Sequence, residues 1–113
     1  MKYALLIYDL PGTYDQLPDA ERAEVFGEYS AISDAPGVYG GAWLQPVETA
    51  TTLRTDDGQP VTTDGPFAET KEFLGGFYLL EADGRDAALE LAKRVPAAQL
   101  GGAIEVRPLV EQQ

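Results

Sequence analysis

The residues best able to do chemistry lie between positions 64 and 72, where the sequence reads DGPFAETKE. Glu69 and Glu72 flank Lys71, and two neighbouring carboxylates keep an ammonium group charged. A charged lysine is a poor nucleophile, but it can hold an anionic or carbonyl-bearing ligand. Glu69 and Glu72 are then candidate catalytic proton acceptors, provided that burial makes them basic enough. A solvent-exposed, salt-linked corner is the alternative interpretation of these three charges.

The first four residues of this stretch predict a turn. Asp64 can bond to the backbone that follows it, Gly65 can take a positive φ, and Pro66 fixes the direction of the chain. Phe67 is expected to anchor the corner in apolar surroundings. A structural role in the turn therefore accounts for the residue types at these four positions. Asp64 is also retained as a candidate ligand contact.

A second pair of charges lies in the last predicted strand. Ile104 and Val106 form its apolar face, so Glu105 and Arg107 lie on the opposite face. If the apolar pair packs on the helices, Glu105 is a further candidate catalytic carboxylate and Arg107 a candidate ligand-binding cation. The alternatives are that the two charges pair with each other, or that they extend into solvent from an edge strand.

The end of the first strand carries a phenol and a carboxylate, Tyr8 and Asp9, which could reach the same region. Their more ordinary roles are a tyrosine that caps the core and an aspartate that flanks a helix. Tyr8 is retained as a candidate ligand contact. Trp43, beside Gly40 and Gly41, either walls a pocket or belongs to the core.

The composition of the 113 residues limits the available chemistry. The absence of cysteine and histidine removes the thiolate nucleophile, the zinc-thiolate site and the imidazole acid or base. We therefore expect no cofactor and no metal site. A formal net charge of -11 repels phosphate backbones and anionic membrane surfaces, so neither nucleic acid nor a membrane is an expected partner. The N-terminal apolar run indicates a strand rather than a signal peptide, and a cytoplasmic location is expected.

Hydrophobic periodicity predicts four core strands, two helices and one hairpin in a single domain over residues 1–113. Asp57 and Gly58 tolerate the positive φ of a tight hairpin turn. Asp83 is predicted to cap the second helix, and Pro96 to end it. The expected elements are strands over 3–8, 38–46, 73–82 and 103–109, a first helix over 18–33, and hairpin strands over 49–55 and 60–63.

The order of these elements predicts an α+β fold, ferredoxin-like βαββαβ with an inserted β-hairpin. Two helices can cover only one face of a four-stranded sheet, yet the first and third core strands are apolar on both faces. A second copy of the sheet is the simplest cover for the other face. We therefore expect a homodimer with its sheets face to face.

Residues 64–72 resemble the DGPFAETKE hallmark of the DGPF domain, a branch of the YCII-related proteins. The similarity extends to the opening strand, to ATTLR at 50–54 and to IEVRP at 104–108. The resemblance implies a dimeric α+β barrel built from ferredoxin-like subunits. Members of this branch are often encoded beside, or fused to, extracytoplasmic-function sigma factors. Related YCII proteins carry a histidine-aspartate pair proposed as an active site, a mechanism that a chain without histidine cannot use.

Two functions follow as hypotheses. The first is a cytoplasmic homodimer with a pocket for an unknown small molecule, anionic or carbonyl-bearing, at the corner between the sheet faces and the motif. If this protein is an enzyme, it uses carboxylate acid/base chemistry. The second is a non-catalytic regulatory partner of a sigma factor, whose acidic surface engages a basic protein. An oligomerisation module without a ligand is a third interpretation.

Overall fold

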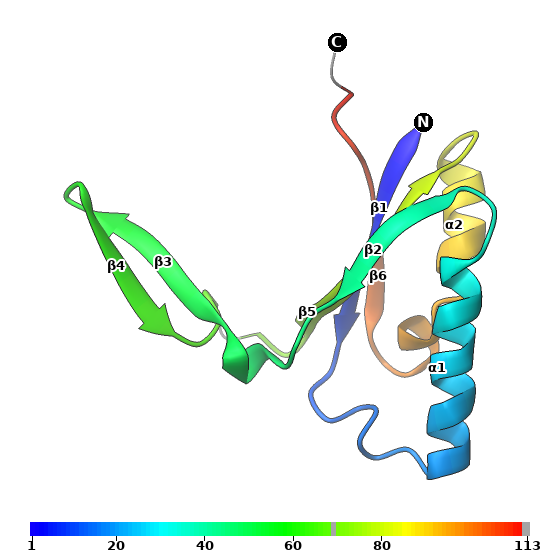
Figure 1. Cartoon of the computed structure of the whole chain (residues 1–113), viewed down its shortest axis with the longest axis horizontal. Coiled ribbons are helices and arrows are strands. Elements are labelled where there is room, and N and C mark those ends of the chain that lie inside the picture. The colour runs from blue at the N-terminus through cyan, green and yellow to red at the C-terminus, as the bar shows by residue number, and fades with distance from the viewer. Residues whose placement is uncertain (69, 112–113) are drawn as a thin grey trace.

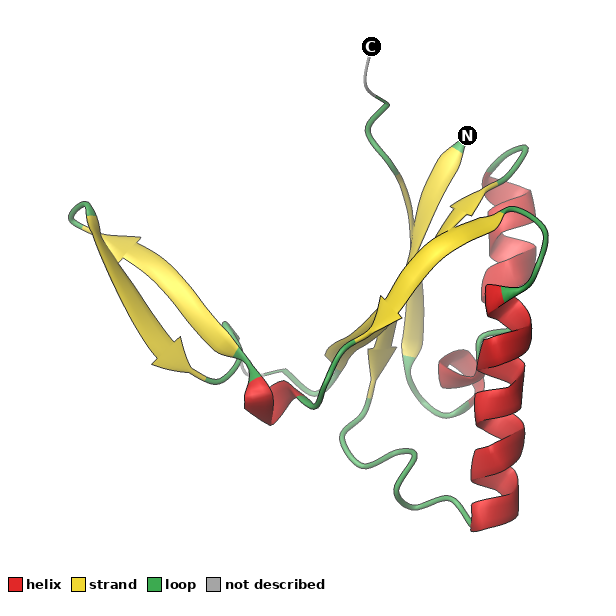
Figure 2. Ribbon diagram, viewed as in Figure 1, coloured by secondary structure: helices red, strands yellow, loops and turns green. Residues whose placement is uncertain are grey.

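The computed structural model describes residues 1–68 and 70–111 and has an α+β fold (Figure 1). Four antiparallel strands form the main sheet in the order β2-β5-β1-β6, and both helices lie on one of its faces (Figure 2). This is the strand order of a ferredoxin-like unit, so the predicted fold class is confirmed. The main-sheet and helix bounds are β1 (Lys2–Asp9), α1 (Asp19–Ser33), β2 (Val38–Trp43), β5 (Phe73–Glu81), α2 (Arg85–Ala92) and β6 (Ala103–Pro108).

The core lies between the sheet and the helices because alternate residues of the central strand β1 point toward them. Tyr3, Leu5 and Ile7 are almost fully buried on this face. Helix α1 contributes Tyr29 and Ile32 to the same cluster of buried side chains. Asp9 continues the alternation of Tyr3, Leu5 and Ile7, so its carboxylate also lies on the helix side of the sheet.

The second helix begins one residue later than predicted. Gly84, rather than Asp83, is the residue at its N-cap, and no side chain caps the helix. The carbonyl of Gly84 accepts the first bond, from the amide of Ala88 at 3.2 Å, which fixes this boundary. The chain leaves the helix after Ala92, and Pro96 starts a short 3-10 helix, η2 (Pro96–Gln99), rather than ending α2 directly.

The inserted hairpin, β3 (Thr51–Asp56) and β4 (Gln59–Asp64), projects away from the main sheet (Figure 1). It follows a short 3-10 helix, η1 (Val47–Thr49), and forms a separate two-stranded sheet. The turn residues Asp57 and Gly58 have φ values of 49° and 79°, as predicted for a tight hairpin turn.

The expectation for Phe67 was wrong, because its side chain is 73% exposed. Gly65 does adopt a positive φ of 104°, and its amide bonds to the Ala50 carbonyl at 2.7 Å. The corner therefore forms at the base of the projecting hairpin, where no apolar surface receives an aromatic ring. Phe67 instead contacts the guanidinium of Arg54, 5.1 Å from the ring centroid.

No described helix or strand covers the face of the main sheet away from the helices (Figure 2). Leu6 pairs with Phe77 and Ala4 pairs with Leu79 across β1 and β5, all on this open face. Tyr8 lies on it as well. No helix in the described part of the chain is long and apolar enough to cross a membrane.

Candidate functional site

The structure brings two of the predicted site residues together on the open face of the sheet. The Arg107 guanidinium donates to the Glu105 carboxylate at 2.9 Å, so these charges form an ion pair, one of the alternatives foreseen. Tyr8 lies on the same face of the sheet, in the neighbouring strand β1. Tyr8 and Leu6 share one face of β1, and Leu6 pairs with Glu105. Tyr8 and Asp9 therefore point to opposite faces of β1 and do not reach the same region.

The candidates of the motif are spread along the connection between the hairpin and β5. Asp64 ends β4 and is exposed, and Lys71 is exposed just before β5. Glu72 is half-buried beside it, and Glu69 lies outside the described residues. In the described part of the chain, no ion pair involves Asp64, Lys71 or Glu72. A catalytic or ligand-binding role for these residues stays a prediction.

A different carboxylate, Asp9, lies at the end of a directed chain of hydrogen bonds. The Tyr14 hydroxyl donates to Asp9 Oδ1 at 2.6 Å and lies 2.7 Å from the Tyr29 hydroxyl. The Tyr29 oxygen accepts the backbone N–H of Ala97 at 3.2 Å. Because the Tyr14 proton is used on Asp9, Tyr29 donates to Tyr14. The bonds therefore run from Ala97 through both tyrosines to the carboxylate, which they hold in one orientation.

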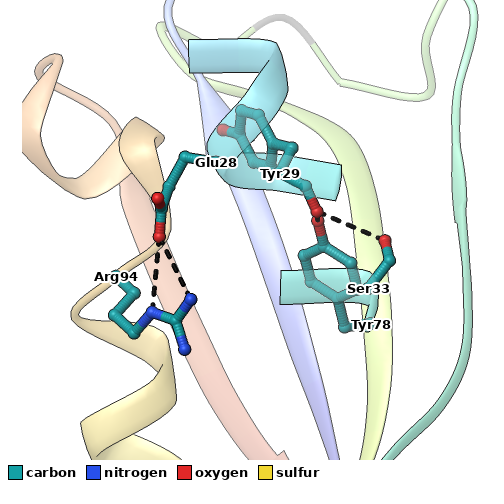
Figure 3. A network of polar contacts seen from close by, with 5 residues as sticks. All are labelled: Glu28, Tyr29, Ser33, Tyr78 and Arg94. Atoms are coloured by element: carbon teal, nitrogen blue, oxygen red, sulfur yellow. Dashed lines mark hydrogen bonds and ion pairs between the residues drawn. The ribbon is translucent and has the colours of Figure 1, made fainter. Parts of the chain in front are cut away.

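The backbone of Tyr29 is fixed as firmly as its side chain (Figure 3). Its carbonyl accepts the Tyr78 hydroxyl at 2.8 Å and the Ser33 hydroxyl at 3.3 Å. At the preceding residue, Arg94 binds the Glu28 carboxylate at 3.3 Å and links α1 to the segment after α2. Tyr29 thus connects the chain of hydroxyls to the core of the fold.

The Asp9 carboxylate lines a pocket of about 340 Å³. The pocket volume is at the lower end of the range for small-molecule sites. Aromatic side chains of Tyr14, Phe26, Trp43 and Phe73 line it as well. Trp43 is 55% exposed, so it serves as a wall rather than as a core residue.

Gly75 keeps the second oxygen of Asp9 accessible. The pairing of β1 with β5 shifts between Ile7 and Tyr8, and Gly75 is the extra residue of β5 at this irregularity. A Cβ at Gly75 would overlap Asp9 Oδ2, so any other residue here would displace the carboxylate. The neighbouring Gly76 meets the Ala42 carbonyl and the Trp43 ring instead. Gly75 therefore serves an irregularity in the strand, and Gly76 serves a close approach between β5 and β2.

Burial changes the acidity of this network. Desolvation raises the pKa of Asp9 above its ordinary value, while the hydrogen bond from Tyr14 opposes that rise. Desolvation also raises the pKa of Tyr29 to about 12 and raises the pKa of Tyr14 further. Both hydroxyls therefore stay protonated at neutral pH, and Asp9 is a stronger base than an exposed aspartate.

A larger groove of about 1110 Å³ lies between the two helices, but it is less suited to chemistry. Both cations of the groove are paired with carboxylates, Arg94 with Glu28 and Lys93 with Glu90. These side chains are well exposed to solvent, which weakens their influence on a ligand. The Asp9 pocket combines an unneutralised, half-buried carboxylate with apolar walls, and it is the stronger candidate.

Sequence reasoning assigned Asp9 to the flank of a helix and missed this site. One signal was present: Asp9 shares the face of Tyr3, Leu5 and Ile7, and a carboxylate on a core-facing position needs a polar partner. That partner, Tyr14, lies in the irregular loop after β1, whose path no periodic pattern specifies.

Comparisons with known proteins give one family match and one relative. The YCII-related domain family matches residues 1–113, the whole chain. An uncharacterised protein of Rhizobium meliloti (strain 1021) is 38% identical over 114 residues, covering 96% of this chain and 92% of the relative.

Proposed function

Because this chain belongs to the YCII-related family and its Rhizobium meliloti relative is uncharacterised, we propose a function from the site itself. The protein binds a small molecule in the Asp9 pocket and moves a proton with the Asp9 carboxylate. The observation that carries this proposal is the half-buried carboxylate with one oxygen held by Tyr14 and the other facing the pocket beside Gly75. We keep the carboxylate acid/base chemistry expected from the sequence, but we assign the proton transfer to Asp9 rather than to Glu69, Glu72 or Glu105.

The geometry suggests how the proton moves. Asp9 Oδ2 accepts a proton from an acidic C–H or O–H group of the bound molecule and later returns it to the same molecule, as a general base and then a general acid. Tyr14 remains bonded to Oδ1 throughout and limits rotation of the carboxylate. The apolar walls exclude water, which strengthens the basicity of Asp9.

A homodimer is part of the same proposal. The uncovered face of the main sheet carries the half-buried side chains of Leu6, Phe77 and Leu79 together with Tyr8, and such an apolar face supports an association site. A second copy placed face to face would bury it and would enclose the Glu105–Arg107 pair. In such a dimer the ion pair would lie in the space between the sheets, close to Tyr8.

Two measurements test the proposed function. Addition of a library of small aromatic compounds to ¹⁵N-labelled protein should shift the amide signals of Leu74 and Gly75 and the indole signal of Trp43. For each compound that binds, incubation in D₂O should show whether a carbon-bound proton exchanges. Exchange should be lost in Asp9→Asn and kept in Asp57→Asn, which removes the same charge at the exposed hairpin turn.

The proposed function would be wrong if no compound shifted these signals, or if binding compounds shifted only residues of the helix groove. Proton exchange that persisted in Asp9→Asn would remove Asp9 from the catalytic role while leaving the pocket as a binding site.

The regulatory role expected from the sequence remains a second proposal, favoured by the exposed hairpin. Leu53 is 63% exposed and Phe67 73% exposed on this projection, next to the Arg54 guanidinium. An isolated two-stranded hairpin is only marginally stable in water, so a protein partner would stabilise it. A purified sigma factor that protected the amides of 51–64 from hydrogen exchange would support this role, and unchanged exchange would count against it.

A further inference from the structure

The Asp9 carboxylate has no counter-ion in the described part of the molecule. None of the ion pairs among residues 1–68 and 70–111 includes Asp9, and its side-chain partner is the neutral Tyr14 hydroxyl. A half-buried charge without a partner costs free energy, and a positively charged ligand would offset that cost. The carboxylate therefore favours a positively charged ligand in the pocket.

The walls of the pocket suit a cation that carries carbon. Four aromatic rings line it, and an aromatic face attracts an ammonium or guanidinium group within about 6 Å of its centroid. Trp43 offers the strongest face of this kind, and its ring is fixed edge-on against Tyr29 with centroids 4.5 Å apart. Phe26 lies near Tyr14 with ring centroids 6.2 Å apart, so a flat molecule would meet aromatic rings from more than one element.

The other charged side chains that line the pocket have the same sign as Asp9. Arg22 is not a lining residue, and its guanidinium donates to the backbone carbonyls of Tyr14 and Asp15. Asp15 and Glu48 line it, and none of the described residues that line it is a lysine or an arginine. The net charge of -11 adds a field that attracts cations and repels anions. Among the described residues, no three carboxylates come together in an arrangement that could hold a metal ion. An organic cation fits this combination better than a metal ion or an anion.

We infer that the Asp9 pocket binds an organic cation, a protonated or quaternary amine attached to a flat apolar body. The nitrogen lies beside the Asp9 carboxylate and leaves one lone pair of Oδ2 for the proton transfer, and the apolar body packs against Trp43 and Phe26. This inference rests on the proposed function, since it names the class of ligand for the same pocket. It replaces the anionic ligand expected from the sequence, because Lys71 and Arg107, the groups expected to hold an anion, do not line this pocket.

A matched series of ligands tests the inference. Benzylamine, benzyl alcohol and benzoate share one ring and differ in charge, and their dissociation constants can be measured by NMR titration at about 0.15 M salt, where distant surface charges are screened. Benzylamine should bind at least roughly tenfold more tightly than benzyl alcohol, as expected for a charge-assisted hydrogen bond, and benzoate should bind least. Asp9→Asn should remove most of the preference for benzylamine, whereas Asp57→Asn should leave it unchanged.

The walls are tested by Trp43→Leu, which should weaken binding of phenyltrimethylammonium, a quaternary cation that cannot donate a hydrogen bond. Leu89→Ala, on the outer surface of α2, is the control for a change at a partly exposed apolar side chain.

Equal binding of benzylamine and benzyl alcohol at the pocket, or tighter binding of benzoate, would overturn the inference and leave the proposed function intact. If no member of the series shifts Leu74, Gly75 or Trp43, the organic-cation inference is wrong. The proposed function fails as well only if the wider library also leaves these signals unchanged.

Discussion

The properties of Asp9 follow from two opposing influences on one side chain. Burial raises its pKa, and the hydroxyl of Tyr14 lowers it by bonding to the charged form. A tyrosine that stays protonated at neutral pH is a steady donor, so the orientation of the carboxylate does not change across the physiological range. In this chain without histidine, a phenol donates to the carboxylate and orients it.

Removal of the Tyr14 hydroxyl should therefore make Asp9 more basic. In Tyr14→Phe the opposing hydrogen bond is lost while much of the burial remains, so the pKa of Asp9 should rise further. A ¹³C NMR titration of the Asp9 carboxyl carbon measures this directly. Tyr39→Phe, at a half-exposed tyrosine of β2, should leave the titration unchanged. A fall in the pKa of Asp9 would show that Tyr14 does not stabilise the charged form.

The raised pKa of Asp9 also makes the stability of the fold depend on pH. The folded protein keeps a proton on Asp9 at pH values where the unfolded chain, with the ordinary value of 3.8, has lost it. The stabilisation from this group is therefore complete below 3.8 and is lost as the pH rises through the folded pKa. Asparagine does not titrate, so the stability of Asp9→Asn relative to the natural protein should increase between about pH 4 and pH 7.

Urea unfolding at fixed protein concentration measures this difference at each pH. Asp57→Asn, at an exposed turn, should show no comparable trend. A relative stability of Asp9→Asn that fell with pH would mean that the ionised carboxylate is stabilised, rather than destabilised, by its surroundings.

At the scale of elements, the site depends on how β5 passes its neighbours. The irregularity at Gly75 opens space for the carboxylate, and Gly76 lets β5 approach β2. Both glycines follow the 64–72 motif closely, and the structure gives them a definite role. Of the charged residues just before them, Lys71 is exposed and Glu72 is half-buried.

Substitution of Gly76 should weaken the contact between β5 and β2. A Cβ there would lie 2.8 Å from the Ala42 carbonyl oxygen and 3.1 Å from the Trp43 ring, so the backbone must move. Gly76→Ala should cost roughly 1–3 kcal/mol of stability, as overpacking usually does. Gly27→Ala, in α1 with no heavy atom within 4 Å, should instead stabilise the protein slightly. Similar melting temperatures for the two variants would contradict this account.

The sequence predicted the elements well because their signals are local. The alternation in β1, the turn at Asp57 and Gly58, and the helical stripe of α1 all appear within a few residues. The position of Asp9 could not be predicted in the same way, since its partners come from the loop at Tyr14 and from Gly75, 66 positions away in β5. Phe67 was misplaced for a related reason: its burial depends on where the hairpin projects, which no local pattern encodes.

At the scale of the whole molecule, the chain is a sheet with helices on one side only. The uncovered side carries Leu6, Phe77 and Leu79, and no helix or strand among residues 1–68 and 70–111 lies over them. The proposed dimer follows from this imbalance. The Asp9 pocket lies at the end of the sheet, on the helix side, so ligand binding and association would use different parts of the molecule.

A charge on the uncovered face should therefore prevent association. Phe77→Lys would place an ammonium group between the two sheets of the proposed dimer, where it would lose its hydration. Sedimentation velocity should show a shift from the mass of a dimer to that of a monomer. Leu89→Lys, on the outer surface of α2, should leave the mass unchanged. A natural protein that sedimented as a monomer at all concentrations would contradict the proposed dimer.

The hydrogen bond between the Tyr29 hydroxyl and the Ala97 amide has a consequence for the order in which the protein folds. It joins residues 68 positions apart, and contacts of such long range carry a large loop-closure cost. We expect it to form after the transition state, so that Tyr29→Phe accelerates unfolding and hardly slows folding. Trp43, the single tryptophan, contacts Tyr29 and can report both rates by fluorescence. On this basis we expect the Asp9 pocket to be completed late in folding and to open early in unfolding.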